Sequence, residues 1–151
     1  MKVTITLTPS EVMLGATAGI MRQVENIKNN ARPFYGAGRD NDWQLNIEGV
    51  LGEMALSKHL GIYWKGKGVM RAPDVGDVDV RTTSYENGHL ILHPNDPDDR
   101  VFYLLTGRNG TYTLHGSILG RDGKLDKWVK DPTGGRPAYF VPQDALRPPN
   151  D

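Results

Sequence analysis

Residues 73–82 alternate acidic and apolar side chains, and this stretch constrains the fold more than any other. It reads Pro-Asp-Val-Gly-Asp-Val-Asp-Val-Arg-Thr. Because side chains of a strand alternate between its two faces, a strand here places Asp77, Asp79 and Arg81 on one face and the intervening valines on the other. The valine face predicts contact with a hydrophobic core. The acidic face needs a cation or Arg81 to offset repulsion between its carboxylates.

The spacing alone leaves two interpretations of this acidic face open. Hard divalent cations such as Mg2+ and Mn2+ bind carboxylate oxygens, so Asp74, Asp77 and Asp79 are candidate metal ligands. In the other interpretation the face is solvated, and Arg81 pairs only with Asp79.

The composition narrows the functional classes. A chain of 151 residues is long enough for one domain with a hydrophobic core. Its 18 basic and 18 acidic residues give no net charge, so a nucleic-acid site would need a local basic patch. The absence of cysteine excludes disulfides and thiolate zinc sites, which favours a cytoplasmic protein. The N-terminus does not have the pattern of a signal sequence, and no apolar run reaches the length of a membrane span, so we expect no membrane partner.

The first 29 residues predict a strand followed by a helix. Apolar residues alternate with threonines over residues 3–8, as in a half-buried strand. Thr8, Pro9 and Glu11 form a capping-box pattern for a helix that runs to about Asn29.

We interpret the apolar stripe of this helix as a core face and not as a partner site. Gly15 and Gly19 weaken the helix, which predicts that another element packs closely there. The stripe consists of Met13, Ile20, Val24 and Ile27.

A second helix is predicted from Trp43 to about Leu60, with Asp42 as its cap. It carries Glu48 and Glu53, which lie about 140° apart around a helix axis. Only one of these carboxylates can therefore face a given site, and the sequence leaves open which one.

The remainder of the chain predicts short strands and turns. Asn87-Gly88 is typical of a hairpin, so we expect a strand at 90–92 to return against the acidic strand. The other predicted strands are 62–64, 101–106, 111–118 and an edge segment at 138–141. The predicted fold is a single α+β domain, in which two N-terminal helices pack on a mixed sheet or meander. The segment 1–29 precedes a core at 43–119, and a tail rich in proline and glycine covers 131–151.

Basic and aromatic side chains occur together around residues 58–71, close to Tyr63 and Trp64. This combination suits a nucleic-acid backbone, although a solvated basic surface explains it equally well. The candidate nucleic-acid contacts are Lys58, Lys65, Lys67, Arg71 and, from the loop 30–41, Arg39.

These motifs resemble those of the PD-(D/E)xK nuclease superfamily, in the variant found in small phage and prophage proteins. The resemblance rests on Pro73-Asp74, on Asp79-Val80-Arg81 and on the helical segment Gly49-Val50-Leu51-Gly52-Glu53-Met54-Ala55. It covers roughly residues 43–119 and implies a restriction-endonuclease-like core. To bring Asp74 beside Asp79 across four intervening residues, the chain must bend at Gly76.

The resemblance also implies roles for individual residues. Asp74 and Asp79 would hold Mg2+ (or Mn2+), with Glu53 assisting from the helix, and DNA would be the substrate. Such a metal lowers the pKa of a bound water and stabilises charge on a phosphodiester. Arg81 stands where the family has a lysine. Arginine binds phosphate well, but its pKa is too high for a general base.

Two other interpretations compete with a PD-(D/E)xK-like nuclease. The first is a catalytically inactive phage protein that keeps the fold and binds a host or phage protein; zero net charge and Arg81 favour it. The second is an HNH-type nuclease built on His93 and Asn95, which lacks a partner histidine and ranks below the others.

Overall fold

The computed structural model describes residues 2–29, 41–66 and 72–149, and it confirms the predicted α+β class. Short 3-10 turns at Asp126–Trp128 and Gln143–Ala145 complete the fold. The helices and strands are β1 (Val3–Thr6), α1 (Pro9–Lys28), α2 (Asp42–Leu60), β2 (Asp79–Thr83), β3 (Leu90–Leu92), β4 (Val101–Arg108), β5 (Thr111–Leu119), α3 (Gly120–Gly123), β6 (Val129–Lys130) and β7 (Ala138–Val141). None of the helices within these described ranges is long and apolar enough to cross a membrane.

The strands form two sheets. The larger has the order β1-β5-β4-β2, in which β2 runs parallel to β4 and the other pairs are antiparallel. The smaller has the order β3-β7-β6. The predicted return of residues 90–92 against β2 is therefore wrong, because Leu90 lies opposite Val141 of β7. The predicted strand at 62–64 is also absent, since these described residues pair with no strand.

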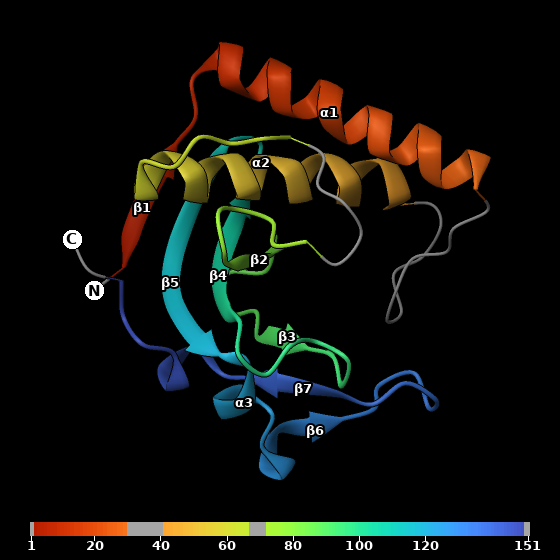
Figure 1. Cartoon of the computed structure of the whole chain (residues 1–151), viewed down its shortest axis with the longest axis vertical. Helices are drawn as coiled ribbons and strands as arrows, with labels where there is room; N and C mark the ends of the chain where they lie inside the picture. The colour runs from red at the N-terminus through yellow and green to blue at the C-terminus, as the bar shows by residue number, and fades with distance from the viewer. Residues whose placement is uncertain (1, 30–40, 67–71, 150–151) are drawn as a thin grey trace.

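The two long helices stack on one face of the larger sheet, with α2 between α1 and the strands (Figure 1). Leu51, Ala55 and Leu56 of α2 pack in a core with Leu105 and Leu114 of the sheet. Helix α2 approaches β2 very closely at Gly52, where a Cβ atom would lie only 2.0 Å from the Thr82 hydroxyl oxygen. Glycine in mid-helix is tolerated here because the close contact leaves no room for a side chain.

A second core lies against part of the opposite face of the larger sheet. It joins Phe102 and Leu104 of β4 to Leu90, Leu92 and Val141 of the smaller sheet. Adjacent residues of β4 thus point into different cores, as the alternation of a strand requires. Helix α2 covers one face of the larger sheet, and β3 and β7 cover the part of the other face that carries Phe102 and Leu104.

The predicted capping box of α1 is confirmed. The Thr8 hydroxyl accepts from the Glu11 backbone N–H, and the Glu11 carboxylate accepts from the Thr8 backbone N–H. Helix α2 ends at Gly61, which adopts the left-handed conformation with φ 68°. Its N-cap residue is Asn41, one position before the predicted cap Asp42.

The interpretation of the α1 stripe as a core face is wrong. Its side chains point away from α2 and are largely exposed: Met13 (71%), Ile20 (43%), Val24 (51%) and Ile27 (56%).

The opposite face of α1 is buried against α2, and it consists of small and polar residues. A Cβ atom at Gly19 would lie 2.6 Å from the Ile47 Cα, so the two backbones touch at this point. Gln23 accepts a hydrogen bond from Asn46 at 2.7 Å. Close backbone contact and specific polar partners therefore position α1 on α2, and the apolar stripe does not contribute to this contact. The close packing predicted from Gly15 and Gly19 is confirmed.

Candidate functional site

The candidate site lies where α2 passes the start of β2, and we call Glu53, Asp74 and Asp79 the acidic site. A tight turn positions the two aspartates: Val75 and Val78 exchange backbone hydrogen bonds of 3.1 and 2.9 Å around Gly76, whose φ is 56°. The bend that the sequence requires at Gly76 is thus present.

Backbone hydrogen bonds hold the two aspartates against each other. The Asp74 N–H donates to Oδ1 of Asp79 at 3.1 Å, and the Val80 N–H donates to Oδ2 of Asp74 at 3.0 Å. Asp79 and Glu53 are both buried. Their carboxylates are close enough to Asp74 to raise its pKa, so α2 and the turn before β2 do converge.

Two arginines neutralise two of these three carboxylates. Arg22 of α1 binds Glu53 through both terminal nitrogens, at 2.7 and 3.0 Å, and Trp64 donates to the same carboxylate at 3.4 Å. Arg100 donates to Oδ2 of Asp79 at 3.3 Å. The hydrogen bonds that Arg22 donates to Glu53 raise the pKa of Arg22, which keeps this guanidinium charged.

Asp74 differs from its neighbours because no arginine or lysine among the described residues forms an ion pair with it. Burial raises the pKa of Asp74 to about 6, and the nearby charges of Glu53 and Asp79 act in the same direction. The Val80 N–H and the charge of Arg81 oppose this shift only in part. A carboxyl group that titrates this close to neutrality is suited to proton transfer or to binding a cation.

Arg81 lies on the same strand but has other partners. It donates to the Ile91 carbonyl at 3.2 Å and to Asp96 at 2.9 Å, and it lies over the Phe102 ring at 5.0 Å. The predicted pairing of Arg81 with Asp79 is therefore wrong. So is the predicted common face, since Asp77 is exposed in the turn before β2 begins.

The residues predicted to contact nucleic acid differ in their partners and in their exposure. Lys58 donates to Glu11 at 2.8 Å and to the Thr6 carbonyl at 3.0 Å, so it ties α2 to α1 and β1. Lys65 is exposed next to Trp64. The other three, Arg39, Lys67 and Arg71, lie outside the described residues. Their assignment to nucleic-acid binding remains a prediction.

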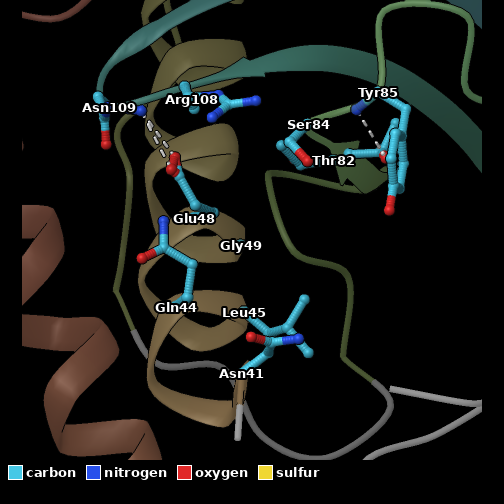
Figure 2. A pocket seen from close by; sticks show the side chains of 11 residues that line it. Asn41, Gln44, Leu45, Glu48, Gly49, Thr82, Ser84, Tyr85, Arg108 and Asn109 are labelled. Atoms are coloured by element: carbon cyan, nitrogen blue, oxygen red, sulfur yellow. Dashed lines mark hydrogen bonds between the residues drawn. The ribbon is translucent and has the colours of Figure 1, made fainter. Parts of the chain in front are cut away.

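A polar cleft of about 570 Å3 opens at the other end of β2, beside the first turns of α2 (Figure 2). Glu48 lies in this cleft and accepts from the Asn109 N–H at 2.9 Å and from the Tyr112 hydroxyl at 2.6 Å. Burial, together with this hydrogen bond, raises the pKa of Tyr112 and keeps its hydroxyl a donor. Glu53, and not Glu48, therefore belongs to the acidic site.

The rim of the cleft carries Arg108 at the end of β4, with Ser84 and Tyr85 facing it from beyond β2 (Figure 2). Sequence reasoning identified neither this cleft nor the roles of Arg22 and Arg100. A signal existed for Arg22 alone, because it lies three and seven positions after Gly19 and Gly15, on the helix face that the glycines mark for close packing.

The comparisons with known proteins found no relative: no family model matches the sequence, and neither a curated protein nor a solved structure does. The chemistry of the acidic site is therefore the main guide to the function of this protein.

Proposed function

We propose that this protein is a metal-dependent nuclease of phage or prophage origin that binds DNA and hydrolyses phosphodiesters at the acidic site. The observation that carries the proposal is Asp74, a largely buried carboxyl group beside two other carboxylates and without an arginine or lysine partner among the described residues. The resemblance to the PD-(D/E)xK superfamily and its restriction-endonuclease-like core supports the same function, since that family uses acids from a helix and a strand.

The donor chemistry of the site fits Mg2+ or Mn2+ through two carboxylates. Mg2+ is usually bound by one or two carboxylates, while waters and substrate phosphates complete its shell. Asp74 and Asp79 supply this pair, and Glu53 could join only after leaving Arg22. As the side chains lie, no group of three or more acidic or histidine residues in the described ranges is arranged around one ion.

A divalent ion bound there would supply an activated water and neutralise charge on the phosphodiester. The protein's own contribution is a pair of anionic ligands and fixed positive charge beside them. With a pKa of about 6 in the metal-free protein, Asp74 is mostly deprotonated at pH 7, so both carboxylates of the pair can bind the ion as anions. Arg22 and Arg100 hold the neighbouring carboxylates in place. Arg108 and the Ser84 hydroxyl in the polar cleft are of the type that binds phosphate oxygens further along a DNA strand.

A second candidate function, a non-catalytic protein that binds a host or phage protein, has one specific observation in its favour. Arg81 is engaged by Asp96 and by the Ile91 carbonyl, so it is not free to contact a phosphate in this arrangement. A protein without catalytic activity does not require Arg81 to leave Asp96 and the Ile91 carbonyl.

Calorimetric titration of Mn2+ tests the proposal, with wild type compared to Asp74→Asn and Asp79→Asn. Asparagine keeps the shape and the hydrogen-bond acceptor but removes the charge. Asp77→Asn is the matched control, because Asp77 is exposed and lies between the two ligands in sequence. We expect the two site variants to weaken Mn2+ binding at least about tenfold, which is about 1.4 kcal/mol. The control should bind as wild type does.

Cleavage of plasmid and single-stranded DNA, with and without Mn2+, completes the experiment. Metal-dependent cleavage that disappears in Asp74→Asn supports the nuclease. Metal binding without cleavage favours the interaction protein and directs attention to Arg81, where Arg81→Lys would test for restored activity. If the wild type binds no metal, the proposed metal site is wrong.

A further inference from the structure

The outer face of α1 is apolar from residue 13 to residue 27, although its side chains stay exposed in the part of the chain that the structure describes. We define this outer face as the six exposed large apolar residues of the helix: Met13, Leu14, Ile20, Met21, Val24 and Ile27. Monomeric proteins rarely expose a continuous apolar patch of this size unless something binds it. Figure 1 shows why it is uncovered, since α1 is the outermost layer, with α2 on its inner side.

The outer face carries no charge. Every exposed residue of α1 from position 13 to position 27 is uncharged, and the first charged one after it is Lys28. The charged residues within that span, such as Arg22, lie at the side of the helix or against α2. A solvated helix surface normally shows the opposite distribution, with charges outward and apolar residues inward.

The spacing within the outer face is that of a helix seam. Met13, Ile20 and Ile27 follow one another at intervals of seven residues, and Thr17 and Val24 fall between them. Apolar residues repeated every seven positions, with a second row three or four positions away, pack against another helix as knobs into holes. The surface therefore fits a partner helix better than a flat sheet or a small ligand.

We propose that a second copy of this chain covers the outer face, through symmetric α1–α1 pairing. Two identical apolar seams bring no like charges together, and the zero net charge of the chain adds no long-range repulsion between copies. A two-fold axis lets the same patch meet itself, which is the commonest arrangement in homodimers. The dimer would then stack four helices, with the two α1 helices inside and an α2 helix on each outer side.

Ile20 provides a direct test because it lies midway between Met13 and Ile27. In a parallel or an antiparallel pair centred on the seam, it faces Ile20 of the other copy. Ile20→Glu alone and Ile20→Lys alone each place like charges opposite one another, which costs several kcal/mol in an interface and should weaken self-association about 100-fold or more. Mixing the two variants places opposite charges together and should restore a heterodimer.

Sedimentation velocity or light scattering over roughly micromolar to millimolar concentrations measures the result on the full chain. Tyr85→Glu is the control, since Tyr85 is 76% exposed but lies far from α1 in sequence and fold, and it should leave association unchanged. Circular dichroism verifies that the variants fold, and Thr17→Glu offers a second substitution in the same seam at a position that is polar already.

Three results would overturn the proposal. A wild type that stays monomeric over the whole range excludes a second copy as the partner. A dimer that survives Ile20→Glu and Thr17→Glu uses another surface. Single variants that are monomeric but do not pair when mixed exclude symmetric contact at Ile20. Because the acidic site contains no residue of the outer face, none of these results depends on the nuclease proposal.

Discussion

Helices α1 and α2 have nearly the same length, 20 and 19 residues, yet the protein buries them in opposite ways. Helix α2 lies between two layers and buries apolar residues such as Val50 and Leu56 completely. Among the described elements, helix α1 packs mainly against α2 and turns its glycines and polar side chains toward it. The difference shows that the apolar residues of a helix are not always its buried residues. Where two helices approach closely through glycine, the small face is the one that packs.

The largest expected difference between the helices is the cost of truncating an apolar side chain. Leu56→Ala in α2 should lower the free energy of unfolding by about 2–5 kcal/mol, since it opens a cavity in the core. Met13→Ala in α1 should change it by less than about 0.5 kcal/mol in dilute protein, where the outer face is solvated. Urea denaturation at low protein concentration measures both. Equal losses would show that the α1 stripe is buried after all.

The second prediction concerns the ion pairs that fasten α1 to α2. Arg22→Met should destabilise the protein by about 3 kcal/mol, because it leaves the buried Glu53 carboxylate unpaired. The control is Lys58→Met, which removes the pair with Glu11; both of those side chains are about a third or more exposed, so the loss should be about 0–1 kcal/mol. Thermal or urea unfolding of the two variants measures both losses of unfolding free energy. Similar losses for Arg22→Met and Lys58→Met would contradict the prediction.

The third and smallest effect follows from the pKa of Asp74. The pKa of Asp74 is about 6 in the folded protein and near 4 in an unfolded chain. At a pH between these two values, Asp74 is therefore protonated in the folded state and deprotonated in the unfolded state. In the absence of metal, stability should therefore fall as the pH rises from about 4 to about 6, by roughly 1–3 kcal/mol from this group.

Asp74→Asn removes this dependence. The variant should be more stable than wild type near pH 7 and nearly equal to it near pH 4, as measured by urea denaturation at both values. Asp77→Asn, at an exposed position, should keep the wild-type profile. A steep wild-type profile that Asp74→Asn leaves unchanged would assign the titration to another group.

Local patterns in the sequence were sufficient for part of this structure. The capping box at Thr8, the end of α2 at Gly61 and the bend at Gly76 each depend on residues a few positions apart. In these cases the residues that decide the local geometry are neighbours in the chain. The position of Glu53 beside Asp74 and Asp79 is different, because the residues alone leave Glu48 and Glu53 open and only the resemblance to the PD-(D/E)xK superfamily implies Glu53.

The errors have a common physical origin in contacts between distant segments. Asn87-Gly88 allows a tight turn, but β3 pairs with β7 because both contribute to the second core. The stripe of α1 correctly indicated an amphipathic helix, but periodicity cannot say which face meets a neighbour. Arg100 was missed for the same reason, since nothing near it in sequence identifies Asp79 as its partner. For Arg22 the glycines of α1 mark the packing face, but they do not identify Glu53 as the partner.

The acidic site has a consequence for the order in which the protein folds. Its ion pairs close loops of 31 residues, between Arg22 and Glu53, and of 21 residues, between Asp79 and Arg100. Forming such long-range contacts costs chain entropy before any interaction repays it, and parallel pairing of the kind seen between β2 and β4 adds to the delay. The charges therefore meet only when most of the chain is in place. An isolated fragment, or a nascent chain that has not yet reached residue 100, cannot assemble the site.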